Sequence, residues 1–173
     1  DRSVSRGLGD VYKRQIFMLT YYLGGINLRD LLAYDFKNKN DMRYVRHKTR
    51  NSKKGENEIV FTLQPEAKVL IDKYMSRNGH LQFGKYSSYK QIYSLVFRHI
   101  NKVTELSGVK KKVTYYSARK TFAQHGYDLG IQIEKIEYCI GHSMKNNRPI
   151  FNYIKIMQEH ADKVFRAVLD QLL

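Results

Sequence analysis

Two helical segments that each end near a glycine shape the second half of the chain. The first is expected over residues 115–128, with Arg119 near its start, and the second over residues 131–140. Gly141 ends the second helix, because glycine readily takes the left-handed conformation that closes a helix, and it delivers His142 to a turn. The chain is therefore predicted to be mainly helical, with an arginine and a histidine at helix ends.

The rest of the sequence adds a short hairpin and more helices. Residues 42–47 and 58–63 are predicted to be strands, the second alternating Ile59, Phe61 and Leu63, and a cation-rich turn joins them. Apolar periodicity predicts further helices over residues 16–32 (broken at Gly24-Gly25), 65–79, 88–108 and 159–172. The expected fold class is α+β, mainly α, with helices packed around a small antiparallel hairpin or three-stranded sheet.

The apolar pattern also predicts which side chains face the core. Those expected to be buried on the last two helices are Ile133, Ile136, Ile140, Ala161, Val164, Phe165, Val168, Leu169 and Leu172. Tyr86, Tyr89 and Tyr93 are expected to pack among the helices rather than to stack on bases. Ser88 and Gln91 have the spacing of a helix capping box.

The charge of the chain favours a polyanionic partner. Lysine and arginine outnumber aspartate and glutamate by 31 to 16, giving a formal net charge of +15. Cations set against phosphates release condensed counterions, although a merely soluble basic surface is the alternative. Residues 1–15 lack apolar periodicity and look like translated adaptor sequence, so we expect a non-native leader; without it the charge is +13. Residues 16–173 are expected to form one domain, with an upstream DNA-binding domain missing.

Several classes of protein do not fit the sequence. Cys139 is the single cysteine, which leaves no internal disulfide and fits a reducing cytoplasm. No stretch approaches the roughly 18 apolar residues of a membrane span. The sequence has no Cys/His cluster at zinc spacing and no glycine-rich phosphate loop, so neither a metal nor a cofactor is expected.

Three short motifs in fixed order carry a family resemblance. They are Thr-Tyr-Tyr-Ser-Ala-Arg-Lys-Thr over residues 114–121, Ile-Gly-His-Ser over residues 140–143 and Asn-Tyr-Ile over residues 152–154. In this order they resemble the catalytic domain of the tyrosine recombinase (phage integrase) family, particularly the integrases of mobile elements. The resemblance covers roughly residues 16–173. It implies a site-specific recombinase that cuts and rejoins DNA without a metal.

The resemblance also implies catalytic roles for four residues. Tyr153 would attack phosphorus to give a 3′-phosphotyrosyl link and a free 5′ hydroxyl, and its phenol, with a reference pKa of about 10, needs activation by neighbours. Arg119 would bind phosphate oxygens through its planar guanidinium. His142 would donate a hydrogen bond to the phosphate or move a proton. Lys48, in the hairpin, would protonate the leaving oxygen.

Two positions depart from the pattern of that family. Asn27 stands where its first catalytic arginine is usual, and Tyr116 stands where a histidine precedes Arg119 by three residues. Arg29 could substitute for the first arginine, but two helical residues turn a side chain by about 200°, so a surface role is the alternative. Asp30 matches the acidic position of the family. The tyrosine hydroxyl can donate to phosphate but cannot shuttle protons at neutral pH.

A wider set of side chains is expected to contact DNA phosphates. It comprises Tyr116, Lys120, Arg29, Lys53, Lys54, Lys110, Lys111 and Lys112. Solvated surface charge is the alternative for the lysines. The expected partners are double-stranded DNA and further copies of the chain, as a synaptic tetramer on DNA. The expected location is the cytoplasm, in association with the nucleoid.

Other functions stay open at this point. A catalytically impaired relative of the integrases could act as a DNA-binding accessory protein, and the substitutions at Asn27 and Tyr116 favour that alternative. A basic helical protein that binds RNA or another protein is a third hypothesis. A type IB topoisomerase uses closely related residues.

Overall fold

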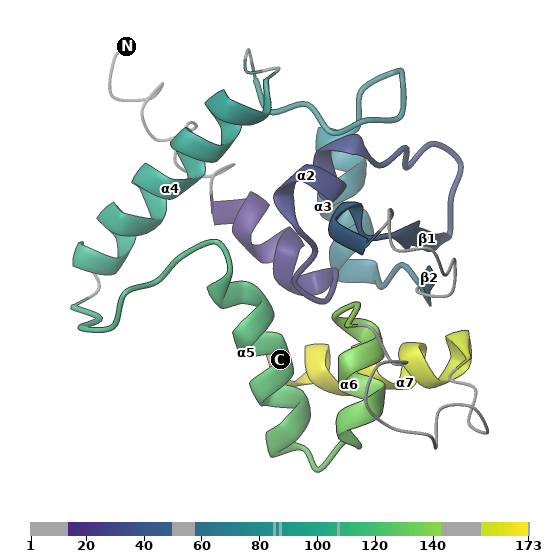
Figure 1. The fold of residues 1–173 in the computed structure, drawn as a ribbon. Coiled ribbons are helices and arrows are strands. Elements are labelled where there is room, and N and C mark those ends of the chain that lie inside the picture. The colour runs from purple at the N-terminus through teal and green to yellow at the C-terminus, as the bar shows by residue number, and fades with distance from the viewer. Residues whose placement is uncertain are drawn as a thin grey trace.

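The structure is a computed structural model that describes residues 14–49, 58–84, 86, 88–106, 108–142 and 157–172. Residues 14–22 are helical. The elements that follow are α2 (Leu28–Ala33), β1 (Asp41–Val45), the 3-10 turn η1 (His47–Thr49), β2 (Glu58–Thr62), α3 (Pro65–Tyr74), α4 (Tyr89–Leu106), α5 (Ser117–Asp128), α6 (Ile133–Cys139), α7 (Gln158–Leu169) and the 3-10 turn η3 (Asp170–Leu172). Figure 1 shows α5, α6 and α7 together on one side, with α2, α3 and the two strands beside them. The predicted class, α+β and mainly α, is confirmed.

The sheet in the described part of the chain is a two-stranded antiparallel hairpin. Asp41 pairs with Thr62 at one end and Val45 with Glu58 at the other. Side chains alternate between the faces of a strand, and here the inward set includes Met42 and Tyr44, both buried. The hairpin form of the prediction is confirmed, and the described residues add no third strand.

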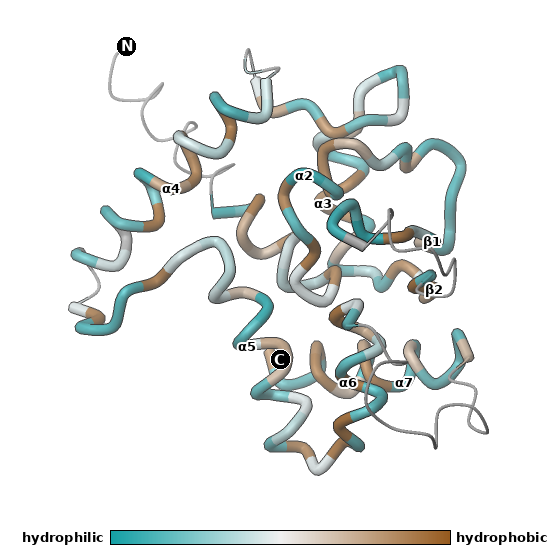
Figure 2. The backbone as a smooth tube through the Cα atoms, in the orientation of Figure 1, coloured by the Kyte–Doolittle hydropathy of each residue, from teal (hydrophilic) through white to brown (hydrophobic). Residues whose placement is uncertain are grey.

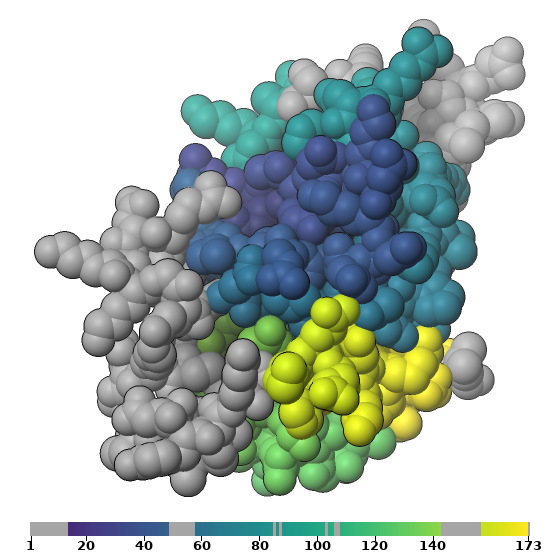
Figure 3. Space-filling model, turned by 90° about the vertical axis from the view of Figure 1, so that its right-hand side faces the viewer, coloured from purple at the N-terminus to yellow at the C-terminus, as the bar shows by residue number. Residues whose placement is uncertain are grey.

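Helix α7 closes the core over the hairpin and α5. The Phe165 ring stacks on Phe61 of β2 with centroids 4.0 Å apart and lies 5.1 Å from Phe122 of α5. The Asp162 carboxylate accepts hydrogen bonds from the backbone N and the hydroxyl of Thr62, at 2.6 and 2.8 Å. In Figure 3 α7 lies directly against the strands in the space-filling view. This packing therefore joins residues about a hundred positions apart in the sequence.

Two of the side chains predicted to be buried on the last two helices are exposed, so these predictions were wrong. Ile133 is 49% exposed, because it is the first residue of α6 and lies at the edge of the apolar face. Leu172 is 45% exposed, because the chain passes from α7 into η3, whose tighter winding breaks the 3.6-residue period. The other predicted core residues of α6 and α7, together with Ile140, are buried.

Helix α4 carries an aromatic ladder that lines a hollow beside residues 114–116. Tyr89, Tyr93 and Phe97 follow at four-residue spacing, with neighbouring centroids 5.9 and 6.2 Å apart. All three are more than a third exposed, so the expected packing of Tyr89 and Tyr93 was wrong. Figure 2 shows hydrophobic and hydrophilic residues alternating along this helix. The predicted capping box at Ser88 and Gln91 is confirmed by two reciprocal hydrogen bonds.

The described ranges show neither a membrane helix nor a metal cluster. None of their helices combines the length and the apolar character needed to cross a membrane. Within the same ranges no three His, Cys, Asp or Glu side chains gather closely enough to hold a metal ion.

Candidate functional site

Arg119 lies at the centre of the candidate site and joins two helix ends. It comes from the first turn of α5 and is only 3% exposed. Its Nε donates to the Gly25 carbonyl at 2.9 Å, and its Nη1 donates to the Ile140 carbonyl. Ile140 is the C-cap of α6, where the helix dipole is negative, so a cation is stabilised there, and Gly25 lies in the turn after the first helix. The buried Nη2 has no hydrogen-bond partner among the described residues.

His142 is positioned by the turn that ends α6. Gly141, at φ +69°, donates from its N to the Tyr138 carbonyl, and the N of His142 donates to the Glu137 carbonyl at 2.8 Å. These two bonds are the Schellman motif expected after a helix-ending glycine. The imidazole is 44% exposed, with Nδ1 3.9 Å from a Glu137 carboxylate oxygen. The turn predicted from Gly141 is therefore present, and it holds His142 two residues from the carbonyl that Arg119 binds.

A second arginine, Arg46, reaches the same turn from the hairpin. It follows β1, and its Nη1 donates to the Gly141 carbonyl at 2.8 Å. A Cβ added at Gly141 would lie 2.6 Å from the Arg46 Cδ, so the aliphatic part of the arginine packs directly against the glycine. Arg46 was not among the site residues predicted from the sequence. The available signal was register, because Arg46 stands two residues after the buried Tyr44 and therefore on the inward face of the strand.

The groups around Arg119 form a positively charged cluster. Burial lowers the pKa of Arg119, and the nearby charge of Arg46 lowers it further. The carboxylate of Asp30 raises the pKa of Arg119. Its Oδ1 accepts a hydrogen bond from the backbone N of His47 at 3.0 Å. Burial raises the pKa of Tyr44, so this phenol stays neutral near pH 7. Two guanidiniums and one carboxylate leave the cluster positive.

The pKa of His142 is expected to lie below its ordinary value of 6.5. Burial lowers it first, then the charges of Arg119 and Arg46, while Glu137 acts in the opposite direction. The unfolded chain then takes up the proton at a higher pH than the folded chain. The contribution of this residue to stability is therefore complete above about pH 6.5 and falls as the pH drops from there toward the folded pKa.

An NMR titration of the His142 ring checks this expectation. The midpoint should lie below 6.5, and Glu137→Gln, which removes the carboxylate that raises this pKa, should lower the midpoint further. A midpoint at or above 6.5, or an upward shift in Glu137→Gln, would contradict the cationic surroundings described above.

The two positions that depart from the family pattern have local structural roles. Asn27 caps α2, since its Oδ1 accepts from the N of Arg29 at 2.9 Å. Tyr116 precedes α5 and is 52% exposed, and its ring centroid lies 5.9 Å from the Arg119 Cζ and 5.9 Å from the Lys120 Nζ. Tyr116 therefore lies beside the candidate site, whereas Asn27 stabilises the start of α2.

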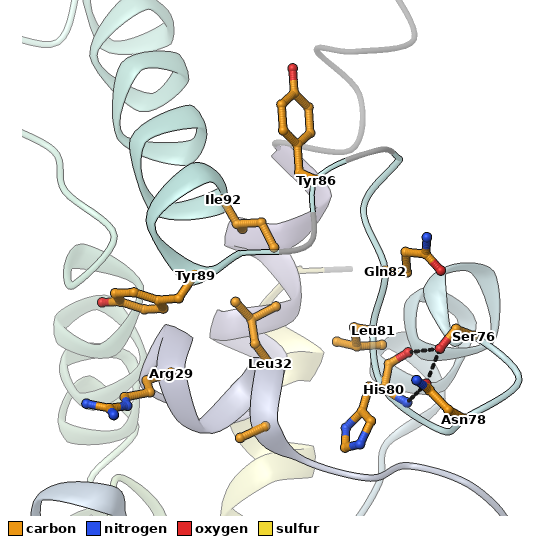
Figure 4. A pocket seen from close by; sticks show the side chains of 11 residues that line it. Arg29, Leu32, Ser76, Asn78, His80, Leu81, Gln82, Tyr86, Tyr89 and Ile92 are labelled. Carbon is orange, nitrogen blue, oxygen red and sulfur yellow. Dashed lines mark hydrogen bonds between the residues drawn. The ribbon is translucent and has the colours of Figure 1, made fainter.

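Arg29 lies away from Arg119, beside a different hollow. Figure 4 shows its side chain near Tyr89, at the edge of a hollow of about 510 Å³ whose other wall includes His80. It is not among the charges that act on Arg119 or His142. The described structure therefore does not bring Arg29 to the candidate site.

The remaining predicted site residues are exposed or lie outside the described ranges. Lys48 is in η1, two residues beyond Arg46, with an exposed side chain. Lys110, Lys111, Lys112 and Lys120 are also exposed. Tyr153, Lys53 and Lys54 lie outside the described residues. The structure thus brings Arg119 and His142 together, adds Arg46, and leaves Lys48 on the segment that continues from it.

Comparison with known proteins gives one distant relative. The chain is 27% identical over 115 residues to a tyrosine recombinase of Pseudothermotoga lettingae. The match covers 64% of the chain but 39% of the relative, so it spans well under half of that protein. No family model and no solved structure matches the chain. The chain therefore has both a distant similarity to a tyrosine recombinase and a site in which an arginine and a histidine lie close together.

Proposed function

We propose that this chain is the catalytic part of a site-specific DNA recombinase that cuts and rejoins DNA through a 3′-phosphotyrosyl intermediate. One observation carries the proposal. Arg119 and His142, 23 positions apart, converge on the turn after α6, where the guanidinium binds the Ile140 carbonyl and its charge lowers the pKa of the histidine. The distant similarity to a tyrosine recombinase supports the same function.

The proposed reaction balances without a metal or an external energy source. The phenol of Tyr153 gives its proton to a base while its oxygen attacks phosphorus in line, and the bond from phosphorus to the 5′ oxygen breaks. Lys48 protonates that leaving oxygen. Arg119 stabilises the charge on the non-bridging oxygens, where positioning and electrostatics supply most of the catalysis of phosphoryl transfer. Rejoining reverses these steps with the 5′ hydroxyl of another strand as the nucleophile.

The remaining parts of the proposal concern DNA and assembly. The exposed cations Lys110, Lys111, Lys112 and Lys120 lie along the approach to α5 and on its first turn, where they would contact the DNA backbone. Recombination joins strands from separate duplexes, so several copies of the chain would assemble on DNA. These contacts position the duplex and carry no sequence information.

Trapping on nicked DNA tests the proposal. A pool of duplexes with randomised sequence, each nicked just 3′ of one phosphodiester, loses the short 5′-hydroxyl fragment after cleavage and traps the protein on DNA. The wild-type chain should form an SDS-resistant adduct in the presence of EDTA, and Tyr153→Phe should form none. Tyr127→Phe, at a 62% exposed tyrosine on α5, is the matched control and should react like the wild type. Equal adduct yields from the wild type and Tyr153→Phe would exclude the proposed nucleophile.

A second candidate function is a DNA-binding accessory protein without cleavage activity. The helix-capping role of Asn27, which leaves no arginine at this position, favours it. It predicts salt-sensitive binding of duplex DNA by the wild-type chain with no covalent adduct on any member of the pool.

A further inference from the structure

The strongest unassigned feature is the pair of arginines that bind consecutive carbonyls. Arg119 donates to the Ile140 carbonyl and Arg46 donates to the Gly141 carbonyl, so both guanidiniums are fixed on one turn. They come from α5 and from the residue that follows β1, which lie far apart in the sequence. A hydrogen bond at each guanidinium and a stem packed on Gly141 fix the two cations in place.

Such a pair of cations favours the binding of an anion. Like charges placed close together repel, and burial of a charged group adds a desolvation cost. The carbonyls of Gly25 and Ile140 and the carboxylate of Asp30 offset part of this cost. Tyr44 offsets none of it while its phenol is neutral. The Nη2 of Arg119, buried and without a hydrogen-bond partner in the described part of the chain, is a donor that an oxyanion would satisfy.

We propose that Arg46 and Arg119 together bind one tetrahedral phosphate, the scissile phosphate of DNA, and that Arg46 is a catalytic residue. It supplies the second guanidinium that position 27, occupied by the capping Asn27, does not provide. The proposal rests on the proposed function for the identity of the phosphate. The anion site itself rests on the placement of the two side chains.

The first experiment measures binding of inorganic phosphate to the 173-residue chain by NMR of the His142 ring and by calorimetry. Arg46→Gln should bind phosphate about ten- to a hundredfold more weakly than the wild type, the effect of losing one hydrogen bond to a charged group. Arg43→Gln is the matched control, because Arg43 is exposed on the same strand and pairs with Glu58. Its phosphate affinity should equal that of the wild type. Equal affinities for wild type and Arg46→Gln would overturn the proposal.

The second experiment separates catalysis from a bracing role. A methylphosphonate in place of the scissile phosphate removes one negative non-bridging oxygen, so it needs less cationic stabilisation. The slowing caused by Arg46→Gln should therefore be at least about tenfold smaller on the methylphosphonate duplex than on the phosphate duplex. A residue that only braces the turn would slow both substrates equally, and that result would overturn the catalytic role.

The Arg46→Lys variant separates a loss of phosphate binding from a loss of folding. Arg46→Lys keeps a cation and most of the stem, and should retain the wild-type melting temperature while binding phosphate more weakly, since an ammonium lacks the guanidinium fork. If the wild type forms no adduct but binds phosphate in an Arg46-dependent manner, the proposed function fails and the anion site stands. If adducts form and Arg46→Lys matches the wild type in both assays, the proposed function stands and the inference about Arg46 fails.

Discussion

An Arg119→Ala variant should form the covalent DNA adduct at least about a hundredfold more slowly than the wild type. Removing one preorganised donor from a developing oxyanion typically costs about 2.7 to 4 kcal/mol, and Arg119 would supply both charge and donors. The substitution also leaves the Gly25 and Ile140 carbonyls without their partner. The measurement is the single-turnover rate of adduct formation on the nicked duplex, with thermal unfolding recorded alongside.

The controls for this prediction separate charge from structure. Arg119→Lys keeps the positive charge but cannot bind two carbonyls and a phosphate at once, so it should remain at least about tenfold slower than wild type. Lys163→Ala removes an exposed cation of α7 that has no part in the proposed site, and should leave the rate within about threefold of wild type. A normal rate in a well-folded Arg119→Ala chain would remove this residue from the proposed mechanism.

Gly25→Ala should be among the most damaging substitutions to the fold. The residue has φ +74°, and an added Cβ would lie 2.3 Å from both the Cα and the Cβ of Arg119. Left-handed backbone costs a non-glycine residue about 1 to 2 kcal/mol, and overpacking against a fixed helix adds about 1 to 3 kcal/mol. The expected loss of unfolding free energy is therefore about 2 to 5 kcal/mol, measured by urea denaturation.

Gly130→Ala is the matched control for this substitution. Gly130 has nearly the same backbone angle, φ +71°, but an added Cβ would meet nothing within 4 Å. The variant should lose only the backbone term, about 1 to 2 kcal/mol. Equal losses in the two variants would mean that the close approach between Gly25 and α5 does not hold Arg119 in place.

The helix-end residues of the site could be predicted from local sequence. Gly141 predicts the end of α6 to within a few residues. The turn that positions His142 follows from that glycine. The hairpin could be predicted for the same reason, because the alternation of Ile59 and Phe61 is local. Local patterns therefore indicated both the main elements and the position of the histidine.

The contribution of Arg46 could not be predicted with the same certainty. Its partner Gly141 is 95 positions away, and no local pattern indicates which helix end a strand will meet. The role of Asn27 was missed for a related reason, since a capping side chain and a substituted catalytic residue look alike in sequence. Ile133 and Leu172 show the third kind of miss, because periodicity does not reveal where a helix begins or changes its winding.

The proposed function requires a tyrosine linked to a DNA 3′ phosphate beside Arg119 and His142. The most direct measurement is tryptic mass spectrometry of the trapped adduct after nuclease digestion, which identifies the modified residue and the polarity of the linked end. The predicted result is a 3′-phosphonucleotide on Tyr153, with a free hydroxyl on the released 5′ end. Attachment to another residue, or a 5′-phosphate link, would contradict the proposed chemistry.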